Sequence, residues 1–140
     1  MKKLLVCLIT LAGCQPSDDK KSIEQIQDQV MVVHDEIMPR TGELMDLREK
    51  ISLKIDSLSK ITPASAVLKT RQEEGIAINK TLSEADIQMD DWMHQYNADT
   101  LKGMDETHAK AYLDLELKKI SDVKAKINGG ITQAKKFLSN

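Results

Sequence analysis

The sequence is poor in aromatic residues, cysteine and proline, and neither sign of charge is in large excess. Aromatic residues make up 3% of the 140 residues, so the bulky side chains that fill many sandwich and barrel cores are scarce. Twenty Lys and Arg oppose 22 Asp and Glu, for a net charge of −2. This balance leaves no basic stripe that would hold nucleic acid, and we expect no nucleic-acid partner. The apolar content of 41% is mainly aliphatic, which predicts one all-α domain.

Catalytic signatures are also missing. The two cysteines, Cys7 and Cys14, lie within the first 14 residues, so the rest of the chain has no thiol for a disulfide or for a cysteine-ligated zinc. The sequence holds no glycine-rich phosphate loop, nucleophile elbow or HExxH motif. Adjacent acids such as Asp90 and Asp91 point about 100° apart on a helix and do not form an acid and base couple. We therefore expect a protein that is not an enzyme.

The N-terminal residues have the order of a secretory signal peptide. Lys2 and Lys3 precede an apolar run of roughly eight residues, 4–11, which is far shorter than the ~20 residues of a membrane-spanning helix. The next residues, Leu11-Ala12-Gly13-Cys14, resemble the lipobox of bacterial lipoproteins, whose cysteine sulfur carries a lipid. We expect residues 1–13 to be cleaved, Cys14 to be lipidated with acyl chains such as palmitate, and 14–21 to be a tether. The protein would then be anchored to a bacterial membrane, facing the periplasm or the cell surface.

The remainder, 22–140, has the periodicity of long helices. A branched aliphatic residue recurs at every seventh position from Ile23 to Leu58, which is the spacing of a helix that packs along its whole length. A second ladder three residues further on is interrupted by Arg40 and Lys54. Ser22 and Gln25 predict a capping box at the start. Pro39 lies inside this helix and should bend it, because proline removes a backbone hydrogen bond.

Two further helices are expected. Thr62-Pro63 is typical of a helix start, and it predicts a second helix from about residue 63 to Tyr96. A turn over 97–103 leads to a third helix from about residue 104, which Gly129 and Gly130 should weaken. Short connections make sequential helices antiparallel. The prediction is an up-down-up bundle of three long helices, coiled-coil-like in its packing, with a kink at Pro39. A long hairpin with the third helix detached is the alternative, and the broad apolar arcs disfavour it.

Antiparallel alignment brings the unusual side chains to one level. It places His34 level with residue 90, and Trp92 level with residue 108. The resulting layer holds thioether, imidazole and aromatic side chains from all three helices: Met31, His34, Met38, Met89, Trp92, Met93, Tyr96, Met104, His108 and Tyr112. Met45 is left outside this layer, and His94 is expected to point outward.

The layer has three interpretations: packing alone, a metal or cofactor site for Cu(I) or haem, and a surface that binds a partner. Methionine fills irregular gaps, so the layer can be packing alone, with no cofactor. Thioether and imidazole groups also suit Cu(I), which His34, Met38, Met89 and Met93 would bind, with His108 as a possible addition. A b-type haem with one His and one Met as axial ligands is a further option. Finally, an exposed methionine surface can bind a partner helix or peptide.

Two segments carry a resemblance to a known group of proteins. HDEIMPRTGEL at 34–44 and MDDWMHQY at 89–96, behind a lipobox leader, are similar to small bacterial helical lipoproteins often labelled "viral A-type inclusion protein". The resemblance implies no viral role and no known activity. Together with the residue patterns, it favours a membrane-anchored helical binding or structural module of the cell envelope. The alternative is a lipoprotein that binds Cu(I), another metal or haem.

Overall fold

The computed structural model describes residues 21–140, and this range contains helices and no strand. The elements are α1 (Ile23–Ile37), α2 (Arg40–Ser59), α3 (Ala66–Gln95), the 3₁₀ helix η1 (Ala98–Gly103) and α4 (Glu106–Ser139). The predicted all-α class is confirmed. The predicted signal peptide, Cys14 and all of the tether except Lys21 lie outside the described residues. Within 21–140, no helix combines the length and the hydropathy that crossing a membrane requires.

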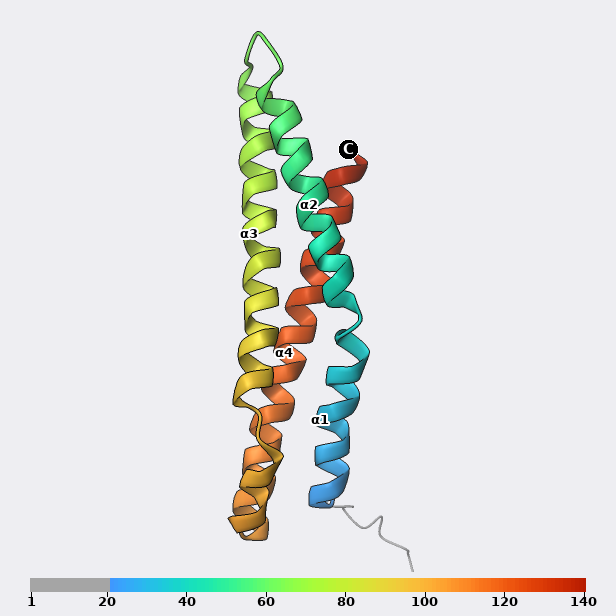
Figure 1. Ribbon diagram of the computed structural model, residues 1–140, viewed down its shortest axis with the longest axis vertical. Coiled ribbons are helices and arrows are strands. Elements are labelled where there is room, and N and C mark those ends of the chain that lie inside the picture. The colour runs from blue at the N-terminus through green and yellow to red at the C-terminus, as the bar shows by residue number, and fades with distance from the viewer. Residues whose placement is uncertain (1–20) are drawn as a thin grey trace, which may run out of the picture.

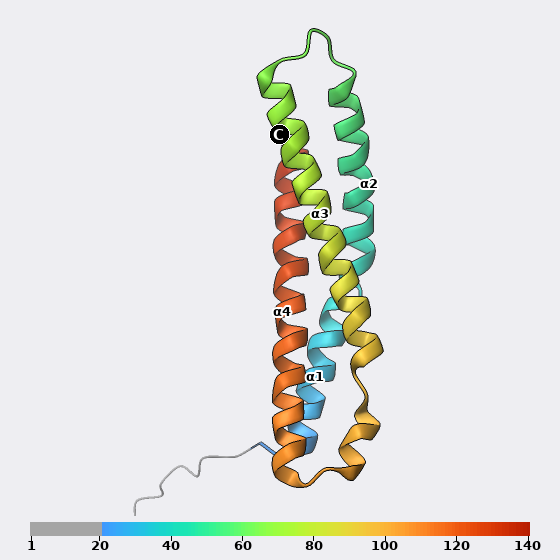
Figure 2. The same ribbon diagram turned by 90° about the vertical axis from the view of Figure 1, so that its left-hand side faces the viewer.

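The helices lie side by side in an elongated molecule. In both ribbon views α1 and α2 rise, α3 returns in the opposite direction, and α4 rises again (Figures 1 and 2). α1 packs on α4, whereas α2 packs on both α3 and α4. The tip of the α2–α3 hairpin extends beyond the end of α4 (Figure 2). The first long segment therefore changes its main neighbour along its length.

That change of neighbour occurs at Met38 and Pro39, which separate α1 from α2. Both residues keep helical backbone angles, with φ and ψ of −55° and −42° at Met38 and −63° and −19° at Pro39. The backbone N–H and hydroxyl of Thr41 both donate to the Met38 carbonyl, at 3.2 and 2.8 Å. We predicted one helix bent at Pro39, whereas the structure interrupts the helix for two residues. The proline ring and its missing N–H account for the interruption.

The starts of the helices follow from local capping. Ser22 and Gln25 form the predicted capping box at α1. The predicted start of the second helix at Thr62-Pro63 is wrong, because α3 begins at Ala66. Ser65 is extended, and its hydroxyl accepts from the Leu68 N–H at 3.2 Å. A serine hydroxyl that satisfies a free N–H of the first turn thus sets the boundary three residues later than the proline suggested.

The core is formed by the predicted aliphatic ladder of α1 and α2 together with the stripes of α3 and α4. Val30, Leu44 and Ile51 are completely buried, and Leu82 of α3 and Ile120 of α4 are equally inaccessible. Burying a side chain of this size contributes roughly 1.5–3 kcal/mol relative to exposure. The two interruptions of the second ladder have structural roles, because both side chains reach α4.

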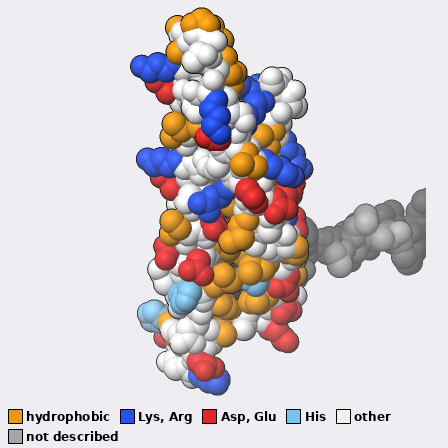
Figure 3. Space-filling model, turned by 45° about the horizontal axis from the view of Figure 1, so that its top comes forward, with side chains coloured by type: hydrophobic (Ala, Val, Ile, Leu, Met, Phe, Trp, Pro, Cys, Tyr) orange, Lys and Arg blue, Asp and Glu red, His pale blue; other side chains and the backbone are white. Residues whose placement is uncertain are grey.

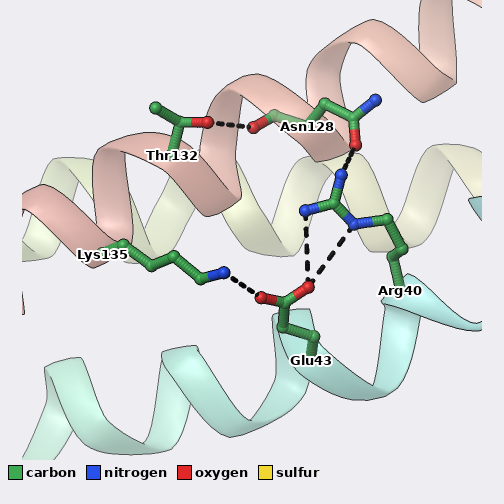
Figure 4. A network of polar contacts seen from close by, with 5 residues as sticks. All are labelled: Arg40, Glu43, Asn128, Thr132 and Lys135. Carbon is green, nitrogen blue, oxygen red and sulfur yellow. Dashed lines mark hydrogen bonds and ion pairs between the residues drawn. The ribbon is translucent and has the colours of Figure 1, made fainter.

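Arg40 and its neighbours fasten the start of α2 to α4 (Figure 4). The Arg40 guanidinium donates to the side-chain oxygen of Asn128 and, at 3.4 Å, to Glu43. Lys135 forms a 2.5 Å ion pair with the other oxygen of Glu43. The hydrogen bond from Lys135 lowers the pKa of Glu43, as does the charge of Arg40. On the other side of the interruption, Lys124 of α4 forms a 2.5 Å ion pair with Glu36 of α1.

Lys54, the second interruption, helps to cap the end of α4. Its ammonium donates to the carbonyls of Phe137 and Leu138 at 3.1 and 3.3 Å. The Arg71 guanidinium donates to the Phe137 carbonyl at 2.5 Å and lies 4.2 Å from the centre of the Phe137 ring. Cations at a helix C-terminus are stabilising because the free carbonyls carry partial negative charge.

Alanine substitutions at two glycines test how tightly the helices pack at each position. A Cβ at Gly75 would lie 2.8 Å from Phe137 and 2.9 Å from Ile55, whereas a Cβ at Gly129 would meet no atom within 4 Å. We expect Gly75→Ala to cost about 1–3 kcal/mol of unfolding free energy through overpacking. Gly129→Ala should instead stabilise by roughly 1 kcal/mol, since alanine favours helix. Urea unfolding followed by circular dichroism measures both. Equal effects of the two variants would contradict this packing.

Candidate functional site

A cavity lined by four methionines lies beside the interruption at Pro39. Its volume is about 330 Å³. We call it the methionine pocket, and its lining residues come from the α1–α2 junction, from α2 and from α3: Met38, Thr41, Met45, Asp86, Ile87, Met89, Asp90 and Met93. The pocket lies near the junction at which α1, which packs on α4, gives way to α2, which packs on both α3 and α4. On the face drawn in Figure 3, apolar side chains gather in the lower half of the molecule.

The methionines differ in depth. Met89 is 1% exposed and belongs to the core, whereas Met93 is partly buried against that core. Met38 and Met45 are 37% and 56% exposed, and Ile87 beside them is 55% exposed. The pocket therefore has a buried thioether at its base and apolar side chains open to solvent at its rim. A ligand that entered it would meet sulfur and methyl groups without unfolding a helix.

The placement of Met45 corrects the sequence prediction. We left Met45 outside the functional layer, but it lines the same pocket as the predicted Met38, Met89 and Met93. Met45 follows Met38 by seven residues, which places the two on one helical face even across the interruption. That spacing was the signal in the sequence that could have identified Met45.

Two carboxylates lie among the lining residues, and both have basic neighbours. Asp86 lies 3.6 Å from the Arg48 guanidinium, and Asp90 lies 3.7 Å from the ring of His94. His94 is 75% exposed, as expected for a side chain that points outward. The two acids and Thr41 give the edge of the pocket a polar character.

The aromatic side chains of the predicted layer form a separate row. The His34 ring lies 5.5 Å from Trp92, Trp92 stacks at 5.0 Å on Tyr96, and Tyr96 lies 6.5 Å from Tyr112. The hydroxyl of Tyr112 accepts from the Asn97 N–H at 3.2 Å. Burial raises the pKa of the Tyr96 phenol, and the nearby Tyr112 and Glu116 raise it further. These contacts favour a packed row of rings that joins α1, α3 and α4.

His34, predicted as a metal ligand, belongs to this row. Its ring nitrogen Nδ1 lies 2.9 Å from the Asp35 carboxylate, and His34 is absent from the lining of the methionine pocket. The predicted set of His34, Met38, Met89 and Met93 is thus divided between the row and the pocket. Met31 and Met104 do not line the pocket either: Met31 is 37% exposed on α1, and Met104 is half-buried after η1.

The predicted level of His108 is wrong. Trp92 shares a second, smaller cavity of about 230 Å³ with Lys119 and Asp122, about three helical turns beyond residue 108. The alignment placed the chain reversal within 97–103, but these residues form η1 and the reversal follows it. His108 instead lies in the first turn of α4, is 76% exposed and pairs with Asp105 at 2.7 Å. The backbone N–H of His108 also donates to Asp105, and this bond lowers the pKa of that carboxyl.

Sequence reasoning also missed a buried acid. Glu116 of α4 is 3% exposed, and its Oε1 accepts from Lys119 at 2.7 Å. Its Oε2 is buried without a hydrogen-bond partner among the described side chains and backbone. Its spacing was a signal in the sequence, because Glu116 follows Leu113 by three residues and precedes Ile120 by four, as in the buried stripe of α4.

Across 21–140, no three His, Cys, Asp or Glu side chains converge as the ligands of a metal ion would. Thioether sulfur is a further class of metal ligand, and methionine supplies it. The methionine pocket is therefore the one cluster described above whose chemistry is that of a soft ligand.

Trp92 offers a test of the aromatic row. It is 5% exposed, and its Nε1 has no hydrogen-bond partner within the described part of the chain. We expect Trp92→Ala to lose roughly 3–5 kcal/mol of unfolding free energy. Trp92→Phe should lose clearly less, because it keeps a ring against Tyr96 and removes an unpaired N–H. Chemical denaturation followed by circular dichroism distinguishes the two. A Phe variant as unstable as the Ala variant would contradict this description.

Comparisons with known proteins assign no family to the chain. No family model, curated protein or solved structure matches it significantly.

Proposed function

We propose that this chain is a membrane-anchored lipoprotein of the bacterial cell envelope that works as a non-enzymatic binding module. Its binding surface is the methionine pocket, and its partner is a helical protein or peptide. The observation that carries the proposal is the shared lining of one open pocket by four methionines from two sides of the bundle.

Methionine suits such a surface for a physical reason. Its side chain is unbranched and polarizable, so it adapts to apolar groups of different shape. Met45 and Ile87 at the rim are each more than half exposed, and their apolar area is removed from water when a partner covers it. Flexible methionine-rich surfaces are typical of proteins that bind amphipathic helices.

The charges around the pocket specify the partner further. Asp86 and Asp90 are lining residues, and their basic neighbours Arg48 and His94 lie at 3.6 and 3.7 Å. An amphipathic helix with an apolar stripe flanked by Lys or Arg would place its cations near these carboxylates. Such exposed pairs favour the correct partner and its orientation more than they raise affinity.

The proposed scaffold is an up-down-up bundle bent at Pro39 and anchored through Cys14. The N-terminus of α1 lies at the same end of the molecule as η1, opposite the α2–α3 connection (Figures 1 and 2). A tether of 14–21 would hold that end near the lipid, and the hairpin tip would point away from it. The methionine pocket would then face sideways, open to a partner in the same compartment.

The anchor is tested by the two cysteines. Cys14→Ser should move the protein from the membrane fraction to the soluble fraction of a bacterial cell, since it removes the proposed lipid attachment. Cys7→Ser is the matched control and should leave the protein with the membranes. Fractionation followed by immunoblotting measures both. Retention of the Cys14→Ser protein in membranes would exclude the proposed anchor.

The partner surface is tested by placing a photo-crosslinking amino acid at Met45 in cells. We expect one discrete adduct, because Met45 is exposed within the pocket. The same amino acid at Leu53, which is 61% exposed on α2 but does not line the pocket, is the control and should give no adduct. Adding Ile87→Asp should abolish the Met45 adduct. Equal adducts from both positions, or an adduct that is insensitive to Ile87→Asp, would contradict the proposal.

A further inference from the structure

We infer that the methionine pocket is also a Cu(I) site, with the thioether sulfurs of Met38, Met45, Met89 and Met93 as its ligands. The inference rests on the proposed function only in using the same pocket. It differs from the ligand set expected from the sequence, since Met45 enters and His34 leaves.

The placement of the four residues is the first argument. Met89 and Met93 are one helical turn apart on α3, so their side chains lie on the same face of that helix. Met38 and Met45 are two turns apart across the interruption at Pro39, and both line the same cavity. Side chains from opposite walls of one pocket can approach a single ion, as ligands from facing helices do in other bundles.

The chemistry of the sulfur atoms is the second argument. Thioethers are soft, neutral ligands that suit Cu(I) and bind Zn²⁺, Mg²⁺ or Ca²⁺ poorly. The described residues contain no thiolate and no converging set of three His, Asp or Glu that would compete with them. Binding would therefore involve no proton release from the ligands and no change of oxidation state. The ion would enter and leave as Cu(I).

The carboxylates and the solvent access around the four methionines also favour a bound cation. Neutral ligands leave the charge of the ion uncompensated. The carboxylates of Asp86 and Asp90 lie in the same lining, with Asp86 also 3.6 Å from Arg48. The pocket is open at Met38 and Met45, which are 37% and 56% exposed, and closed at Met89, which is 1% exposed. An ion can thus reach the sulfurs from solvent while the core side provides a low-dielectric base that strengthens the attraction of the acids.

The test uses the full chain carrying Cys7→Ser and Cys14→Ser, so that no thiol competes for the ion. Titration of Cu(I) from a chromophoric chelator should show one equivalent bound per chain. With Ag(I) as a non-oxidisable substitute, the methyl NMR signals of Met38, Met45, Met89 and Met93 should shift together. The signals of Met31 and Met104 are internal controls and should stay in place.

Leucine replacements identify the ligands without emptying the pocket, because Met and Leu have similar volumes. Met45→Leu and Met93→Leu should each weaken Cu(I) binding by at least about tenfold, while Met31→Leu leaves it unchanged. Circular dichroism checks that each variant remains folded.

Three results would overturn the inference: no binding, shifts at Met31 or Met104 in place of the pocket residues, or full binding by the chain with all four residues changed to Leu. None of them bears on the crosslinking from Met45, which is measured in cells with a protein partner. The helix-binding function and the Cu(I) site can therefore fail separately.

Discussion

The missing N–H of Pro39 is the constraint on which the rest of this structure depends. An uninterrupted helix would have kept one set of neighbours along its whole length. The proline instead interrupts the helix for two residues, and the chain that leaves the interruption packs on α3 as well as α4. A pocket lies beside this interruption, and Ile87 is among its lining residues. Methionines line it, and their flexible thioethers suit an uneven gap.

Polar contacts hold the bend in one geometry. Lys124 pairs with Glu36 before the interruption, and Lys135 pairs with Glu43 after it. Both lysines come from α4, so one straight helix fixes the position of two helices that meet at an angle. Each exposed pair contributes little free energy by itself, but a network that spans the bend limits the angles that the bend can take. The lowered pKa of Glu43 reflects the same contact with Lys135.

Helix α3 separates two kinds of chemistry. Met89 and Met93 of α3 line the methionine pocket. Trp92 and Tyr96, at the end of the same helix, belong to the aromatic row with His34. Trp92 also lines the small cavity beside Lys119, so a single helical turn connects the pocket, the row and the α4 surface. Met89 lies three residues before Trp92, so the buried base of the pocket and the indole are neighbours on the same helix. This closeness makes the fluorescence of Trp92 a natural reporter of events in the pocket.

The sequence by itself determined the helical class, the aliphatic ladder, the capping box at Ser22 and the position of the interruption. Each of these follows from contacts between residues close together in the chain. It also selected Met38, Met89 and Met93 as neighbours. The start of α3, the level of His108 and the inclusion of Met45 were decided only by the tertiary structure. A helix start moves with whichever side chain best satisfies the free N–H groups, here Ser65. The chain reverses only after η1, and the heptad pattern of the helices does not reveal where a reversal falls. The residues of α4 that lie level with α3 are therefore later in the sequence than predicted.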